Sequence, residues 1–591
     1  MANREPIQYI EIDVDYCTLT YATGVCTAVL GTTGTRKCFN TFNTCQDQVN
    51  FNKGVKTLRF INNRSNLPKG LIAYPVLKDN GISAFSSTVN IAGSDDKLGA
   101  FGRRATVTVD LDDFLDDDIY FDKYQLERIS GAAQYSGIGY TPKDNGTFFS
   151  RLKARWPHYA NRPMRIIDGY VDGGVLTVTQ TRHYIITTMD GPDSGGSVSI
   201  EGKDVLSLAD DKKATVPVAS KGKLGSDITV DAGVTFDLIP AGIGAEYAAS
   251  GWATIGSEIV SFTRSSDTIT VVSRGLYGTT VATHSTNDSF QEAYNVQNMR
   301  VDDLIYDLLV NYANVDSTFC PLVAEWEPEI TTWLSGLFLD TVIAKPTGVA
   351  QLIGELAVLG IAVWWDDIEQ KIKLMATHPV TTEQIYPLSD RNNIKKITQE
   401  DNDEARVTQV HFYTRQTDPT LDYKRKDNYN QINVIVDADS ENSNAYGTPL
   451  IKEVFCRWIN NGADAFVRVL ALRLLKRFNT APKLYTILLD VKDRDIQLTT
   501  VIELDSYIVT DEAGVNFKTL LQAIKRVEKK SGHELEITAQ AFKFDGRYGY
   551  IMANTTPVFS SASDAEKLHG GFFANNTTLK MSDGSNPYTF I

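Results

Sequence analysis

The sequence contains no long hydrophobic run and little cysteine. No stretch reaches the roughly 18 uninterrupted apolar residues of a membrane-spanning helix, so we expect no stable membrane insertion. The first residues, Met-Ala-Asn-Arg-Glu-Pro, lack the apolar centre of a signal peptide, and we therefore expect synthesis in a reducing cytoplasm. Structural disulfides are uncommon in that compartment, which weighs against pairing of the six cysteines.

A surplus of basic residues is also missing. The net charge is −15 at pH 7, whereas a protein that grips the phosphates of nucleic acid needs clustered Lys and Arg. The acidic balance is compatible with a soluble surface, or with a channel wall to which DNA does not adhere.

Catalytic motifs are absent as well. The seven histidines are widely spaced, and H-E-x-x-H, G-x-S-x-G and G-x4-G-K-[ST] do not occur. Two acidic runs, Asp110–Asp118 and Asp437–Asn442, lack the loop pattern of an EF-hand, and we expect solvated loops there. We therefore expect no enzymatic activity.

The length and the apolar content favour several packed domains. The chain has 591 residues, of which 42% are hydrophobic and 10% aromatic, too many for one core and too apolar for global disorder. The pattern of apolar and polar residues changes along the chain, and it predicts a mainly β, multidomain fold with α+β parts. We expect a cysteine-rich segment at 1–60, a β-barrel-like domain at 61–215 and a small inserted all-β domain at 216–297. An α+β domain at 298–394, a second β-barrel-like domain at 395–545 and an extended polar tail at 546–591 are expected to follow.

Local patterns place individual elements within these domains. Thr147–Trp156 is a helix candidate that ends before Pro157, and a longer helix is predicted from Ala463 to about Phe478. Trp364 and Trp365 lie next to each other on a predicted hairpin strand, where side chains alternate between faces. One of them is expected in the core and the other at an interface.

Four of the six cysteines, Cys17, Cys26, Cys38 and Cys45, fall within the first 45 residues. Their spacing, C-x8-C-x11-C-x6-C, is wider than the C-x2-C knuckle of zinc ribbons, so it leaves several causes open. Two disulfides, a tetrahedral metal site, an iron–sulfur cluster and independent thiols all remain possible. Thiolates suit Zn²⁺ or iron–sulfur clusters, and a segment with so little apolar sequence needs a staple.

The segment also contains Tyr21-Ala-Thr-Gly-Val-Cys26, Cys38-Phe-Asn-Thr-Phe-Asn-Thr-Cys45 and the pair Asn50-Phe51. With these motifs it resembles the cysteine-rich segment of siphophage tail tip proteins and of the hub proteins of gene transfer agents. The chain departs from that family in lacking Gly-Phe-Pro after Asn-Phe. The resemblance implies a [4Fe–4S] cluster held by Cys17, Cys26, Cys38 and Cys45, with Zn as the alternative.

A second resemblance lies further along the chain. Trp252–Arg264, together with Ser273-Arg-Gly-Leu-Tyr-Gly-Thr-Thr-Val-Ala-Thr-His-Ser285, is similar to a small β-module inserted in many tail hubs. These resemblances imply a structural baseplate hub, or tail tip, of a long non-contractile phage tail. Such a protein is a virion component assembled in the host bacterial cytoplasm.

The resemblance also implies the partners. Three copies would form a ring, and each chain would contribute two β-barrel hub domains. The ring would thereby match a hexameric tail tube on one side to a trimeric tail fibre or central spike on the other. Distal tail proteins and the tape measure protein would be neighbours, and phage DNA would pass through the lumen without specific binding. The cluster would be structural. The alternatives are a tail-associated cell-wall hydrolase and a redox iron–sulfur protein, although no flavin or nucleotide motif is present to pass electrons onward.

Overall fold

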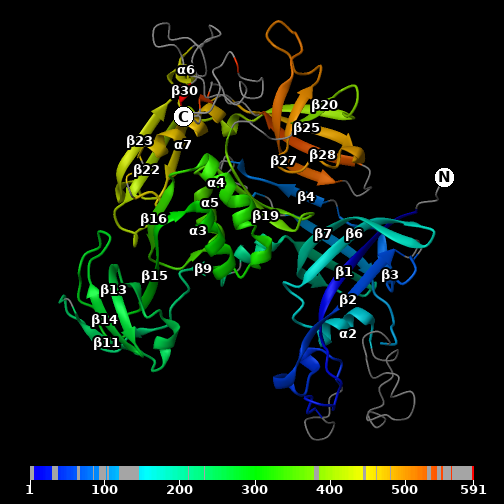
Figure 1. Ribbon diagram of the computed structural model, residues 1–591, viewed down its shortest axis with the longest axis horizontal. Coiled ribbons are helices and arrows are strands. Elements are labelled where there is room, and N and C mark those ends of the chain that lie inside the picture. Colours follow the sequence, from blue (N-terminus) through cyan, green and yellow to red (C-terminus); the bar gives the residue numbers. More distant parts are fainter. Residues whose placement is uncertain are drawn as a thin grey trace.

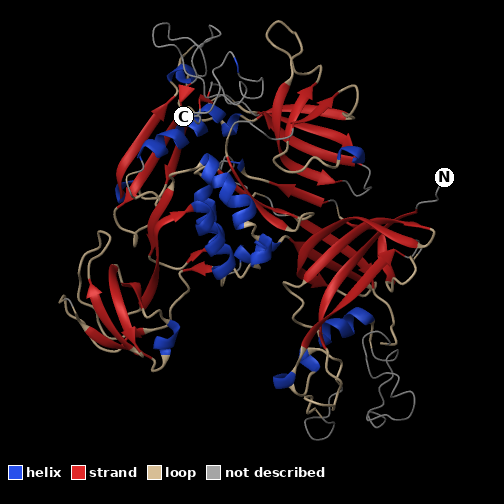
Figure 2. Cartoon of the chain, in the orientation of Figure 1, coloured by secondary structure: helices blue, strands red, loops and turns tan. Residues whose placement is uncertain are grey.

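The computed structural model describes residues 5–28, 38–62, 67–83, 85–91, 101–102, 105–118, 146–210, 212–231, 233–378, 385–443, 447–460, 462, 464–479, 481–528, 534–541, 548–549, 561 and 589–590. The fold is mainly β, with 44% strand and 18% helix, and it is multidomain, as the sequence predicted. Sheets lie at the periphery and helices gather in the middle (Figure 2). Within the described ranges, no helix combines the length and the apolar character needed to cross a bilayer.

The first unit is a closed barrel. Its strands are β1 (Glu5–Cys17), β2 (Lys53–Asn62), β3 (Tyr74–Ile82), β5 (Thr106–Asp112), β6 (Pro163–Asp172), β7 (Val175–Asp190) and β8 (Ser197–Lys203). They follow the order β5-β3-β2-β1-β6-β7-β8, and β8 pairs back onto β5 to close the ring. Alternate residues such as Ile10 and Ile12 fill the interior, because successive strand side chains point to opposite faces.

One end of this barrel is covered by α2 (Phe148–Arg155), close to the predicted helix. Thr147 and Ser150 form a reciprocal capping box at its start, which satisfies amides that the first turn leaves open. Phe148, Phe149 and Leu152 pack into the barrel core.

A second β unit resembles the first, but its described strands do not form a closed barrel. Its strands are β20 (Ile385–Ser389), β21 (Lys396–Asp401), β25 (Lys483–Asp490), β26 (Val501–Asp505), β27 (Thr519–Glu528) and β28 (Glu534–Ala541). Their order is β21-β25-β28-β27-β26-β20, around a core of their own. The short strand β4 (Phe85–Thr88) pairs with both β5 and β27, so one continuous sheet runs through both units.

The centre of the molecule is an α+β body. Its helices are α3 (Val301–Asp307), α4 (Glu327–Trp333), α5 (Val349–Ala357), α7 (Asp464–Phe478) and two π-helical turns, Leu308–Tyr312 and Leu322–Trp326. Its strands are β18 (Ile361–Asp366), β19 (Lys371–Ala376), β22 (Gln409–Gln416), β23 (Tyr429–Val436) and β24 (Ile451–Phe455). The sheet β23-β22-β24 with α7 lies within the sequence range expected for the second barrel, yet it shares the hydrophobic core of the α+β body.

The inserted all-β module has its own core and stands apart at the lower left of Figure 1. It contains β10 (Lys223–Leu224), β11 (Thr235–Ile239), β12 (Ser250–Ile255), β13 (Glu258–Ser265), β14 (Thr268–Ser273) and the first half of β15 (Phe290–Arg300). Beyond a bulge between Val296 and Met299, β15 continues along β16 (Phe338–Ile343) in the body. The chain enters and leaves the module side by side, since the amide of Phe290 donates to the carbonyl of Gly222 at 3.0 Å.

The expected polar tail, 546–591, lies outside the described residues apart from three short stretches. Two of these, β29 (Tyr548–Gly549) and β30 (Thr589–Phe590), pair as parallel strands.

Candidate functional site

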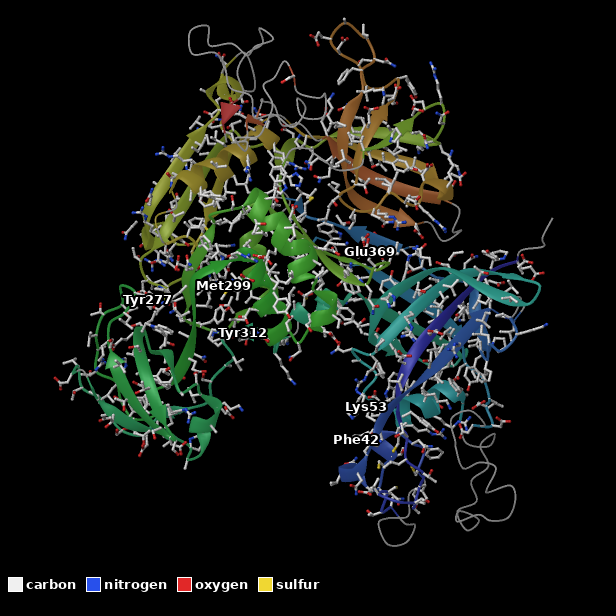
Figure 3. The ribbon with its side chains drawn as sticks, in the orientation of Figure 1. Phe42, Lys53, Tyr277, Met299, Tyr312 and Glu369 are labelled. Carbon is white, nitrogen blue, oxygen red and sulfur yellow. The ribbon has the colours of Figure 1, made fainter. Side chains whose placement is uncertain are left out.

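The cysteine segment is the connection between two neighbouring barrel strands. Cys17 is the last residue of β1 and faces Lys53 at the start of β2. The described residues between them, 18–28 and 38–52, extend beyond the barrel end, in blue at the bottom of Figure 1, and Figure 3 labels Phe42 and Lys53 near the base of this extension. Two 3₁₀ turns, Phe42–Thr44 and Gln48–Asn50, shape the part that follows Cys38.

The four cysteines predicted as one site do come together. Cys17, Cys26, Cys38 and Cys45 all line one small hollow, beside Leu19 and Tyr21 among others. All four are free thiols. The remaining two cysteines, Cys320 and Cys456, are buried elsewhere, in the core of the α+β body.

Hydrogen bonds between the arms of the segment hold this convergence. The amide of Cys17 donates to the carbonyl of Asn40 at 2.7 Å, which joins the end of β1 to the stretch after Cys38. The amide and hydroxyl of Thr27 both donate to Asp47 Oδ2, at 2.7 and 2.8 Å. The residue after Cys26 is thereby tied to a residue just beyond Cys45.

Burial and mutual proximity affect how these thiols ionise. The pKa of Cys38 is raised to about 11, mainly by burial and in smaller part by the nearby Cys45, Cys17 and Cys26, although the amide of Asn40 donates to its sulfur and opposes the shift. The pKa of Cys45 is also raised, first by burial and then by Cys17 and Cys26. Since nearby thiolates disfavour one another, a bound cation would stabilise their deprotonated forms together.

The donor set fits a soft metal, but the ligand geometry is not already formed. Four thiols around one apolar-walled hollow supply the sulfur ligands that zinc and iron–sulfur clusters use. However, among the residues that the structure describes, no group of three or more His, Cys, Asp or Glu side chains stands close enough together to hold a metal ion.

The first acidic run, Asp110–Asp118, anchors α2 instead of forming a solvated loop throughout. Asp118 is almost fully buried and accepts hydrogen bonds from both terminal nitrogens of Arg155, at 2.9 and 2.8 Å. Arg151 adds a contact of 3.1 Å to the same carboxylate. Asp113 accepts the backbone amide of Phe149 at 3.0 Å. Charges that looked merely exposed in the sequence therefore position a helix.

Sequence reasoning missed a buried ionic junction between the units. Arg182 on β7 is 1% exposed, and three carboxylates surround it. Its Nη1 lies 2.9 Å from Asp168, its Nε 3.5 Å from Asp367 in the β18–β19 turn, and its Nη2 contacts Glu528 at the end of β27. The guanidinium also stacks on the ring of Phe85 at 4.0 Å. Both β units and the α+β body therefore meet at one guanidinium.

A second buried carboxylate organises the inserted module. Glu258 is fully buried and takes part in five hydrogen bonds: with Arg274 Nε and Nη2 at 2.9 and 2.7 Å, the amides of Gly275 and Ala282 at 3.1 Å, and His284 Nε2 at 2.9 Å. Burial alone would raise the pKa of Glu258, but the hydrogen bonds from Arg274, His284 and Ala282 outweigh it and lower the pKa to about 2. Glu258 thereby closes both ends of the loop 275–282.

That loop is where the module touches the body. Figure 3 labels Tyr277 beside the junction, with Met299 on the neighbouring strand. The hydroxyl of Tyr277 lies 3.4 Å from Asn295 Oδ1 on β15. Gly278 has φ +78°, and a Cβ on it would lie 2.2 Å from the carbonyl oxygen of Thr417. Glycine is required there both by the backbone conformation and by the close approach.

No family model matches the chain, and neither does any curated protein. Among solved structures, the chain is similar to the tail protein from Neisseria meningitidis MC58, with 11% identity and a TM-score of 0.36 over 78% of this chain and 93% of that one. A 43 kDa tail protein of prophage MuSo2 from Shewanella oneidensis has 10% identity and a TM-score of 0.33, over 78% of this chain and 95% of that one. A chain of the native gene transfer agent virion has 10% identity and a TM-score of 0.28, over 59% of this chain and 94% of that one.

Proposed function

We propose that this chain is the structural hub subunit at the tip of a long non-contractile phage tail. The observation that carries this proposal is the presence of two β units in one chain, a closed barrel and a second barrel-like sheet, joined into one sheet through β4. Three copies of such a chain would present six β units around one axis. That arrangement would match a hexameric tail tube on one side and a trimeric fibre or spike on the other.

The joint between the two units supports this role because a symmetry adaptor must hold both at a fixed angle. β4 pairs with β27 from Lys525↔Thr88 to Glu528↔Phe85, and the amide of Val89 donates to the carbonyl of Ile524 at 2.9 Å. The buried Arg182 junction lies at the same place. Ladder hydrogen bonds and a desolvated ion pair together resist bending between the units.

The partners follow from the proposed position. The tail tube and distal tail proteins would bind one face of the ring, the fibre or spike the other, and the tape measure protein would end in the lumen. With a net charge of −15, the ring would let DNA pass without retaining it. The role is assembly of the virion, not catalysis.

The cysteine hollow would hold a [4Fe–4S] cluster, with zinc as the alternative occupant. Among its described residues the segment has a buried cluster of only Tyr21, Ala28 and Cys38. A metal centre contributes folding free energy that such a small core cannot provide. Cys17, Cys26, Cys38 and Cys45 would be its ligands, and their task would be to fix the extension at a joint with neighbouring tail proteins.

Two experiments test these proposals separately. For the position, gold-labelled antibodies against the inserted module should mark one end of the tail in electron micrographs of particles that contain this chain. Labelling along the tail or on the capsid would contradict the hub role. For the metal, anaerobically purified protein should be brown and carry about four iron atoms per chain. Colourless protein with one zinc would replace the cluster with a zinc site, and protein with neither metal would contradict both.

A further inference from the structure

Two strand edges at opposite ends of the molecule have no pairing partner among the described strands. β23 pairs only with β22, on one side. In β7, residues 175–181 pair only with β6, because pairing with β8 begins at Ile185. Figure 1 places β23 at the upper left and the tip of the β6–β7 hairpin at the far right, so one chain cannot join its own two edges.

The first of these edges carries an exposed apolar face. Ile432, Val434 and Val436 alternate along β23 and are 47%, 48% and 45% exposed. The residues between them point inward, towards the side on which α7 packs. Ile451 on β24 extends the same outer face and is 51% exposed. No charged residue occurs from Tyr429 to Val436.

The second edge has the same chemical character. Residues 175–181 read Val-Leu-Thr-Val-Thr-Gln-Thr and contain no charge. Val175 is 64% and Val178 48% exposed, and Thr177 and Thr179 are exposed as well. Leu176 packs inward, against the small apolar cluster beneath the hairpin.

Three other sheet edges in the described part of this chain are protected in the usual ways. β21 carries Lys396, Glu400 and Asp401, and β24 carries Lys452 and Glu453, charges that discourage pairing with another strand. β20 contains Pro387, which cannot donate a ladder hydrogen bond. An uncharged, β-branched edge left open is the feature that strand addition uses.

We infer that β23 of one copy of this chain pairs with residues 175–181 of β7 in the next copy. The two edges match in length, eight residues against seven, and both lack charge, so neither repels the other. Since the edges differ and lie at opposite ends, the contact is head-to-tail, and repeated contacts close a ring. This interface rests on the proposed hub function and names the surface through which the ring forms.

Substitutions that place a charge on either edge test the interface in the full-length protein. We expect wild-type protein to oligomerise at micromolar concentrations in light scattering coupled to size exclusion. Val434→Lys and Thr177→Lys should each associate at least about tenfold more weakly, because a lysine must lose its hydration to enter a strand pair. Gln399→Lys, on the already charged β21 edge, is the matched control and should associate like wild type. Unchanged melting temperatures establish that all three variants fold.

Mixing the two variants tests the direction of the contact. A Val434→Lys copy retains an intact β7 edge and a Thr177→Lys copy an intact β23 edge, so an equimolar mixture should form dimers and stop there. If Thr177→Lys alone still associates, β23 pairs with itself and the inference is wrong. Wild-type protein that stays monomeric, or a Val434→Lys variant that associates normally, also overturns it. Because gold labelling locates the chain independently, these failures would leave the hub role standing.

Discussion

Arg182 and Glu528 form an ion pair across 346 positions of sequence, and the pair joins the closed barrel to the second β unit. Water and dissolved ions cannot take the place of either partner, since the Arg182 side chain is 1% exposed and the Glu528 side chain 15% exposed. The angle between the two units therefore depends on a contact that a single substitution removes.

Arg182→Met should lower the free energy of unfolding by about 3–5 kcal/mol, because it leaves several carboxylates around a buried site without their shared cation. Chemical denaturation followed by tryptophan fluorescence measures the change. Lys203→Met, which removes a half-exposed partner of Glu201 on β8 of the same barrel, is the control and should cost less than about 1 kcal/mol. Equal effects of the two substitutions would mean that the junction carries no special stability.

Glu258→Gln should destabilise the inserted module by about 3–5 kcal/mol, because Arg274 then stays buried without its counter-ion. The hydrogen-exchange rates of the amides of Gly275 and Ala282 should rise together, since in the unsubstituted protein both amides donate to Glu258. Glu246→Gln, which alters an exposed pair with Lys221 in the same module, should leave those amides protected.

The module should also lose stability in acid. The folded-state pKa of Glu258 is about 2, below its ordinary value of 4.5, so its contribution is fully present above about pH 4.5 and is lost as the pH falls towards 2. Thermal melting of the module between pH 7 and pH 2 should reveal this slope. The slope should be smaller in Glu258→Gln, and an identical slope in both proteins would assign it to other groups.

Gly278→Ala should weaken the contact between the module and the body. The added Cβ meets the carbonyl of Thr417 at 2.2 Å, and overpacking of this kind costs about 1–3 kcal/mol beyond the backbone strain. Gly233→Ala is the matched control, since Gly233 has φ +74° but nothing within 4 Å of the new carbon. Limited proteolysis near residue 220 should accelerate in the first variant only.

On the proposed cluster, Cys38→Ser combined with Cys45→Ser should reduce bound iron at least about tenfold, because two of the four proposed thiolate ligands are lost. It should also impair folding of the extension and, on the proposed hub role, assembly of tails. Cys320→Ser removes a buried thiol in the α+β body and should keep the full iron content. Infectious particles assembled from the double variant would show that the cysteines are dispensable.

Some of the fold and site followed from local sequence pattern. The mainly β character, the helix after Thr147 and the helix ending at Phe478 are confirmed, because each depends on periodicity or capping within a few residues. Trp364 and Trp365 were expected to face opposite ways. Both are buried, and the indole of Trp365 donates to the carbonyl of His183, so it does lie at an interface between units.

The long-range parts could not be predicted. Arg182, Asp367 and Glu528 have no common local pattern. The pairing of β4 with β27 brings Glu528 to the barrel, and the bond from the amide of His183 to the carbonyl of Asp367 holds the β18–β19 turn against β7. The sheet of β22, β23 and β24 looked like barrel strands because its alternation is the same, but it packs against α7 and shares the core of the α+β body. The convergence of the four cysteines was predicted, but their spacing did not indicate how the arms of the segment are tied together.

Because the chain enters and leaves the inserted module side by side, at Gly222 and Phe290, the module can be removed or replaced as one piece. Its core is separate from that of the body, and the two points where it joins the body are already within hydrogen-bond distance of each other. A short turn could therefore replace the whole module without opening the sheet of β15 and β16. Exchanging the module as a unit would leave the rest of the scaffold unchanged.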